Sequence, residues 1–232
     1  MAEWRIGRRW SERELEGRLK RLEGARRNFD EDPESLPVPG WRTYSSEAII
    51  ATCDPGLPRP GGPFERGREA LARYEFSDRR IVRAYFDPAE PLTGRCMLLQ
   101  ISAFRLLNYL SGVVVGAVRS ERSDDETAVG FRYDTLEGHI ERGTEWFLLR
   151  KQHDTGAIRF RISACWKPGD FPNWWSGLGF RIFGPHYVRS WHSRAHQIMS
   201  TIVRRSQEGA PDRPEWKRAR PDILFERSKS NA

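Results

Sequence analysis

β-prone runs separated by short polar loops dominate the middle of the sequence. The runs are residues 96–104, 106–118, 129–133, 144–150 and 158–166. Sequential strands joined by short loops favour an antiparallel meander, because parallel strands need long crossover connections. In the last run Ile158, Phe160 and Ile162 alternate with Arg159 and Arg161. This alternation predicts one core face and one hydrated face.

One long amphipathic helix is expected after these strands. From Pro185 to Arg205, apolar residues recur at helical spacing. These residues are Val188, Trp191, Ala195, Ile198, Met199 and Ile202. With a strand at 41–52 and a shorter helix at 64–74, the pattern predicts an α+β fold. The long C-terminal helix is expected to lie across the concave face of a curved antiparallel sheet.

The ends of the chain are expected to lie outside this domain. Ser11 and Glu14 have the spacing of a capping box, which predicts the start of an amphipathic helix that docks onto the domain edge. Within the tail, residues 223–225 are a possible docking point. The expected segments are a basic N-terminal amphipathic helix (1–29), a proline-rich linker (30–40), the α+β domain (41–205) and a basic, disordered tail (206–232).

The positive charge is confined to the two ends. The formal net charge is +7, and residues 1–29 contribute +4 while residues 204–232 contribute +3, so the residues between them sum to zero. No recognised nucleic-acid motif accompanies this charge, and nucleic-acid binding is therefore not expected. A scaffold or nucleic-acid-associated role of the arginine-rich ends is kept as an alternative.

Several other classes of protein lack support. No apolar run approaches the roughly 20 residues of a membrane-spanning helix, and the first residues do not resemble a signal peptide. Cys53, Cys96 and Cys165 are far apart and odd in number, which argues against a disulfide framework or a structural zinc site. No glycine-rich phosphate loop precedes a helix. We expect a cytoplasmic protein with no transmembrane segment and no cofactor.

The stretch FRYDTLEGHIERGTEWF, residues 131–147, carries a motif that resembles the signature of the family DUF1990, a domain of unknown function. The matching residues are Phe131, Tyr133, Thr135, Leu136, Gly138, His139, Glu141, Gly143 and Glu145. Flanking segments such as GRCMLLQ, GVVVGAV and RFRISACWKP agree with it. Ile140 and Asp134 depart from the family pattern, which often has proline and a small residue there.

The resemblance implies a fold more than a reaction, since the family has no established activity. The family looks like a relative of the START and Bet v 1-like (SRPBCC) proteins. In that helix-grip fold, a curved antiparallel sheet wraps a long C-terminal helix around an apolar cavity. The strands and the long helix expected from periodicity agree with this implication.

His139 and Glu141 are the candidate catalytic residues. A carboxylate beside an imidazole forms a general acid–base pair, and an enzyme of the cyclase or hydrolase type would use them. The alternative is structural: Gly138 and Gly143 supply unusual backbone angles, and His139 and Glu141 cap turn amides. The structural interpretation is favoured, because the sequence identifies neither a third catalytic group nor a pocket.

His192 and His196 are four residues apart on the expected helix, which is the spacing of a metal-binding pair. Arg194 lies between them where a metalloprotease motif has a glutamate. We therefore expect two solvated histidines on the helix surface and no metal site.

Aromatic residues gather in the C-terminal half, where sheet and helix should face each other. They make a small apolar or amphipathic ligand the expected partner, and a non-enzymatic binding protein the favoured function. A filled aromatic core is the alternative. Trp174 and Trp175 are expected to form a mobile lid or a surface patch. The expected ligand-binding residues are Tyr133, His139, Trp146, Trp166, Trp175, Tyr187 and Trp191.

Overall fold

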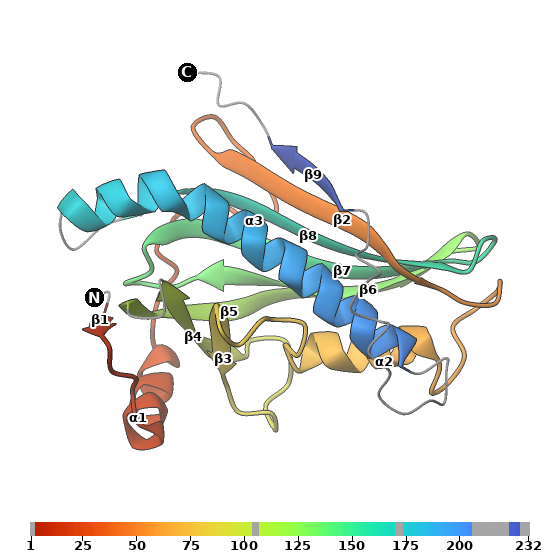
Figure 1. The fold of residues 1–232 in the computed structure, drawn as a ribbon, viewed down its shortest axis with the longest axis horizontal. Coiled ribbons are helices and arrows are strands. Elements are labelled where there is room, and N and C mark those ends of the chain that lie inside the picture. The colour runs from red at the N-terminus through yellow and green to blue at the C-terminus, as the bar shows by residue number, and fades with distance from the viewer. Residues whose placement is uncertain (1–2, 104–106, 170–173, 206–222, 228–232) are drawn as a thin grey trace.

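In the part of the chain that the structure describes, nine strands form one antiparallel sheet that grips a long helix (Figure 1). The computed structural model describes residues 3–103, 107–169, 174–205 and 223–227. The strands are β1 (Glu3–Ile6), β2 (Arg42–Thr52), β3 (Val82–Tyr85), β4 (Cys96–Ala103), β5 (Leu107–Arg122), β6 (Glu126–Thr135), β7 (Glu141–Gln152), β8 (Ala157–Pro168) and β9 (Leu224–Arg227). The helices are α1 (Glu12–Leu22), α2 (Pro63–Ala72) and α3 (Trp174–Arg204).

The sheet has the strand order β3-β4-β5-β6-β7-β8-β2-β9, and β1 pairs with β5 outside this path. Strands β4 to β8 follow one another in sequence, each antiparallel to the next. The pairing register shifts between Val115 and Ala117 in β5 and between Ile49 and Ala51 in β2. Such bulges bend strands and increase the twist of a sheet. The predicted antiparallel meander is confirmed.

Helix α3 crosses the inner face of the sheet diagonally, over β2, β8 and β7, and α2 lies beside its C-terminal part (Figure 1). The apolar stripe of α3 faces the sheet, because Ala195, Met199 and Val203 have no exposed surface. Phe147 of β7 and Phe160 of β8 are equally buried beneath it. Each such side chain contributes about 1.5–3 kcal/mol of hydrophobic stabilisation. The predicted α+β helix-grip fold is confirmed.

The outer face of the sheet is covered by the N-terminal segments. Leu15 of α1 packs with Trp10 against Leu98 and Leu110. Leu98 alternates with Met97 and Leu99, which belong to the main core on the other face. Residues 30–40, expected to be a linker, lie along the outer face of β8. Their apolar side chains Leu36 and Val38 join a cluster of Phe29, Trp41 and Cys165.

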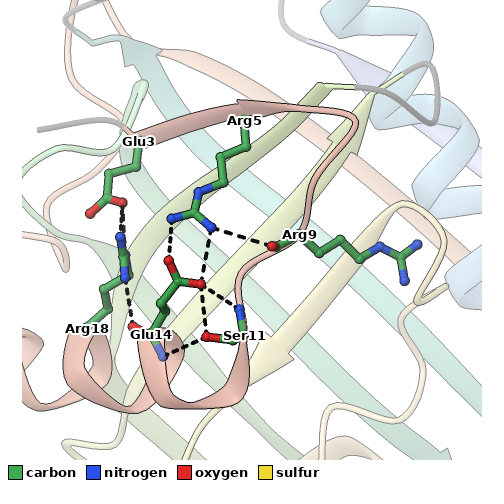
Figure 2. A network of polar contacts seen from close by, with 6 residues as sticks. All are labelled: Glu3, Arg5, Arg9, Ser11, Glu14 and Arg18. Atoms are coloured by element: carbon green, nitrogen blue, oxygen red, sulfur yellow. Dashed lines mark hydrogen bonds and ion pairs between the residues drawn. The ribbon is translucent and has the colours of Figure 1, made fainter.

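Two ion pairs fasten α1 to β1 (Figure 2). The Arg18 guanidinium lies 2.5 Å from the Glu3 carboxylate, and that of Arg5 lies 2.5 Å from Glu14. The predicted capping box is confirmed: the amide of Glu14 donates to Ser11 Oγ, and the Glu14 carboxylate accepts from the amide of Ser11 at 2.8 Å. Several of the N-terminal charges are therefore neutralised within the segment itself.

The structure also differs from the expected elements. Helix α3 begins at Trp174, eleven residues before the predicted start at Pro185, so the expected loop around Trp174 and Trp175 is helical backbone. The glycines of this region, which have low helix propensity, had favoured a loop. Strands β1 and β3 were not predicted. At the predicted docking point, β9 pairs with β2, and the remainder of the tail lies outside the described residues.

Candidate functional site

The connection between β6 and β7 holds His139 against its own backbone. Gly138 has φ +88°, which favours glycine, and Tyr109 Oη donates to its carbonyl oxygen at 2.8 Å. The amide of Glu141 donates to His139 Nδ1 at 3.0 Å, and the amide of His139 donates to the Leu136 carbonyl oxygen at 3.0 Å. Burial lowers the pKa of His139 to about 4, so its imidazole is neutral near pH 7. These contacts are those of a turn-capping side chain.

Gly143 is required for close strand packing and not for the unusual backbone angle that was expected. Its φ is outside the positive range, and a Cβ there would lie 2.2 Å from the Cys165 carbonyl oxygen and 2.9 Å from Trp166 Cα. Gly143 therefore permits the close approach of β7 and β8. The expectation of a special φ at Gly143 was wrong, because backbone proximity rather than turn geometry requires glycine there.

The two departures from the family pattern are both buried. Arg132 Nε donates to Asp134 Oδ1 at 2.8 Å on the outer face, and Arg132 also pairs with Glu34 of the 30–40 segment. Gly116 makes room for this pair, because a Cβ at Gly116 would lie 2.2 Å from Asp134 Oδ2. Ile140 is buried in the turn. Asp134 thus takes part in a buried ion pair on the outer face, and Ile140 packs within the turn.

Glu141 and Glu145 stand on the inner face of β7, which the regular pairing with β8 keeps in register. Burial, with a smaller contribution from the charge of Glu145, raises the pKa of Glu141 to about 7. Glu141 nevertheless keeps some accessible surface. Within the described residues its carboxyl group has no hydrogen bond or ion pair. Glu141 is therefore largely surrounded by protein but keeps part of its surface in contact with solvent. We expect such a carboxyl group on the wall of a recess.

A chain of buried polar side chains links Glu145 to α3. Tyr133 Oη, on the neighbouring strand β6, donates to Glu145 Oε2. His192 Nε2 lies 3.4 Å from Glu145 Oε1. Ser46 Oγ of β2 lies 2.7 Å from His192 Nδ1 and 2.8 Å from His196 Nε2. Three strands and the helix therefore supply one continuous network.

One set of tautomers satisfies this network best. If Ser46 donates its single hydroxyl proton to His192 Nδ1, His192 carries its proton on Nε2, facing the Glu145 oxygen. His196 then donates from Nε2 to Ser46 Oγ. The opposite assignment would direct a lone pair of His192 at a carboxyl oxygen. Burial lowers the pKa of His196 to about 3, which keeps its imidazole neutral.

The prediction that His192 and His196 are solvated was wrong, because both side chains have 0% exposed surface. Their polarity suggested the helix surface, but their positions follow the apolar stripe: His192 comes four residues after Val188 and three before Ala195. That spacing was the available signal. Ser46 lies between the two rings and binds one nitrogen of each. Among the described residues, no cluster of three potential metal ligands occurs.

Several buried polar atoms near the Glu145 network lack a hydrogen bond of good geometry. Among the described residues, Tyr74 Oη, His192 Nε2 and His196 Nδ1 are buried and make no hydrogen bond of good geometry. Burial, and then the charge of Glu145, raise the pKa of Tyr74 well above its ordinary value. The surrounding rings are Phe76, Phe147 and Trp191, and Phe147 contacts both Tyr133 and Trp191 at centroid distances of 5.4 and 6.2 Å.

Four of the seven expected ligand-binding residues lie in three different places. Tyr133 and Trp191 belong to the core between sheet and helix, and the Trp191 indole donates to Ser77 Oγ at 3.0 Å. Trp166 lies at the end of β8, with the Arg42 guanidinium 5.4 Å from its ring centroid. Trp146 points to the outer face, where it lines a separate groove of about 490 Å³ beside the 30–40 segment. Trp146 is on the outer face because successive residues of a strand point to opposite faces, and its neighbours Glu145 and Phe147 are on the inner face.

The remaining expected residues do not join the network in the described part of the chain. His139 caps the turn, and Tyr187 is partly exposed on α3. The side chain of Trp175 lies outside the described residues, so the lid hypothesis stays a prediction. Sequence reasoning did not single out Tyr74, Ser46 or Glu145 as site residues, although Glu145 closes the sequence motif.

A sheet closed on one long C-terminal helix makes this chain a helix-grip protein. It belongs to the family DUF1990, a domain of unknown function, whose model matches residues 25–206. The match includes every residue of the network around Glu145. No curated protein sequence matches the chain significantly.

Two solved structures resemble the chain at low identity. The crystal structure of Ara h 8.0201 is 12% identical with a TM-score of 0.41, over 71% of this chain and 98% of that chain. The crystal structure of human STARD10 is 9% identical with a TM-score of 0.37, over 91% of this chain and 84% of that chain. At these values neither likeness carries an argument about function. None of the helices in the described ranges is both long enough and apolar enough to cross a membrane.

Proposed function

We propose that the protein binds a small apolar or amphipathic ligand between the inner face of the sheet and α3. The ligand's apolar body lies among the aromatic side chains of Phe147, Trp191 and Tyr133. Its polar group meets the side chains around Glu145. The binding is non-enzymatic in this proposal.

One observation carries the proposal: unpaired polar atoms gather around Glu145 inside an otherwise apolar interior. A buried polar group without a partner costs on the order of 1–3 kcal/mol, and a purely structural core therefore rarely retains one. Here Tyr74 Oη makes no hydrogen bond of good geometry, and among the described residues His192 Nε2 has only the long contact of 3.4 Å with Glu145 Oε1. A ligand that hydrogen-bonds to these groups offsets that cost when it binds.

Glu141, four residues before Glu145 on the same face of β7, supports the same conclusion. Its pKa of about 7, raised by burial, is typical of carboxyl groups in functional recesses. An apolar wall with a few convergent polar groups is the usual composition of a small-molecule site.

The test is titration with the neutral dye N-phenyl-1-naphthylamine, followed by the indole N–H signals in nuclear magnetic resonance spectra. Trp191 and Trp146 provide a matched pair, because one lies between sheet and helix and the other on the outer face. Their signals are assigned with Trp191→Phe and Trp146→Phe. We expect the dye to shift the Trp191 signal and leave that of Trp146 in place. Movement of Trp146 alone, or of neither, would overturn the proposal.

An acid–base enzyme is the second candidate, and Glu141 is the observation that favours it. A pKa of about 7, raised by burial, suits a group that exchanges protons near neutral pH. His139 would not be its partner, because His139 Nδ1 accepts from the Glu141 amide. This function predicts that a ligand recovered from the protein is converted on incubation, and that Glu141→Gln abolishes conversion while the ligand still binds.

A further inference from the structure

We propose that the ligand carries a protonated amine and that Glu145, with Tyr133 and Tyr74, binds it. This inference rests on the proposed function and adds the chemical class of the ligand. It concerns the inner face alone, and the groove beside Trp146 has no part in it.

The first argument is charge. Glu141 and Glu145 stand on the same inner face of β7, and within the described residues no arginine or lysine forms an ion pair with either carboxyl group. By contrast, Glu47 on β2 lies within 3.6 Å of the guanidinium groups of three arginines. The described basic group nearest to Glu145 in an ion-pair geometry is the His192 imidazole, at 3.4 Å. A buried carboxylate without an arginine or lysine partner favours a cationic ligand, because pairing restores the stabilisation that water gave it.

The second argument is hydrogen-bonding capacity. The Tyr133 hydroxyl donates to Glu145, so its oxygen can only accept further hydrogen bonds. The oxygen of Tyr74, a residue with 5% exposed surface, lies near the Tyr133 hydroxyl but makes no hydrogen bond of good geometry within the described residues. Glu145 and these two oxygens offer three acceptors. A primary ammonium group has three donors and no acceptor, and it matches that set.

The third argument is the position of the apolar groups. Phe147 packs between Tyr133 and Trp191 and also contacts Tyr74 at a centroid distance of 5.8 Å. Aromatic rings around a cation add attraction through their quadrupoles. An aliphatic or aryl body attached to the amine would fill the remaining apolar surface. The ligand class is therefore an organic amine with an apolar body.

The test compares three ligands that share one apolar body: n-octylamine, n-octanol and n-octanoic acid, each displacing N-phenyl-1-naphthylamine from the full chain. We expect octylamine to compete at about tenfold lower concentration than octanol, which corresponds to one charge-assisted hydrogen bond. Octanoate should compete least. The net charge of +7 works in the opposite direction, since it attracts anions to the surface.

Two variants locate the effect. Glu145→Gln keeps the shape of the side chain, and we expect it to reduce the preference for octylamine to about twofold while the dye still binds. Tyr74→Phe removes an unpartnered hydroxyl, so it should fold at least as well as the parent and lose part of the preference. Glu137→Gln, at an exposed position in the β6–β7 turn, is the control and should leave the preference unchanged.

The outcomes separate the two proposals. Equal competition by octylamine and octanol with normal dye binding would overturn the amine inference and leave the proposed function standing. An amine preference that persists in both Glu145→Gln and Tyr74→Phe would also overturn it. Absence of dye binding would remove the proposed function and this inference together.

Discussion

At the scale of single residues, Glu141 has a large effect on how stability depends on pH. Burial raises its pKa from an ordinary 4.5 to about 7 in the folded chain. The folded state therefore holds the proton more tightly than the unfolded state. The corresponding stability is fully present below about pH 4.5 and is lost as the pH rises through 7. The loss is on the order of 3 kcal/mol for a shift of this size.

Replacing Glu141 by glutamine should remove this loss. We expect Glu141→Gln to match the parent near pH 4 and to exceed its free energy of unfolding by about 2–3 kcal/mol at pH 8. Urea unfolding at a series of pH values measures the difference. His139 and His196 lose stability in the acid range, because burial depresses their pKa values, but they are present in both proteins and cancel. A difference that does not change with pH would show that the carboxyl group is hydrated.

Ser46 is the residue on which the two buried imidazoles depend. Its hydroxyl binds His192 Nδ1 and His196 Nε2, and Ser46→Ala would leave both nitrogens unpaired inside the protein. We expect a loss of about 2–3 kcal/mol in the free energy of unfolding, measured by urea denaturation. Ser45→Ala, one position along on the outer face, should cost less than about 1 kcal/mol. Equal effects of the two substitutions would refute a special role for the network.

At the scale of elements, β9 contacts both β2 and α3. Phe225 contacts the Tyr44 ring at a centroid distance of 6.0 Å and lies 5.0 Å from the Arg189 guanidinium of α3. Tyr44 in turn contacts the His192 ring at 4.9 Å. A four-residue strand is therefore tied to the network through one aromatic residue.

Loss of the Phe225 ring should weaken the pairing of β9 with β2. We expect Phe225→Ala to speed amide hydrogen exchange at residues 44–47 of β2 by about tenfold, because an edge strand that opens more often exposes its hydrogen bonds. Leu224, with 64% exposed surface, provides the control, and Leu224→Ala should leave the exchange rates unchanged. Unchanged exchange in both variants would mean that β9 does not protect the edge.

The periodicity of apolar residues predicted the long strands and the long helix. The short strands form because a neighbouring strand is available to pair with them. Strands β4 to β8 carry enough alternating residues to be recognised without their neighbours. Strands β1, β3 and β9 have four residues each, too few for a pattern, and they form because an edge or face is available to pair with. Helix α3 begins at Trp174, before the first residue of the apolar stripe that predicted it, and the glycines of this segment had argued against helix.

The site was less predictable than the fold because it is assembled from distant segments. The motif contained Tyr133 and Glu145, but only the strand register sets them opposite each other. Ser46 and His192 are 146 positions apart in sequence. The polarity of His192 and His196 suggested solvent, whereas their helical spacing indicated the core. The placement of Trp146 likewise follows from its alternation with Glu145.

At the scale of the whole molecule, the distribution of charge is the unifying feature. Basic residues dominate the two ends, and α1 is fastened to β1 by pairs such as Arg18 and Glu3 (Figure 2). Within the described inner face, neither Glu141 nor Glu145 forms an ion pair with an arginine or a lysine. The chain thus combines a basic periphery with an acidic, aromatic-lined interior under α3. That combination suits a small ligand with an apolar body and a basic nitrogen.

The most direct test of this account is native mass spectrometry of the full chain purified from its source. We predict a fraction that is heavier than the polypeptide by one small organic molecule, which denaturation releases and which contains a basic nitrogen. Added n-octylamine should replace that molecule with one-to-one stoichiometry. The bare polypeptide mass, with no stoichiometric complex when octylamine is added, would contradict the account.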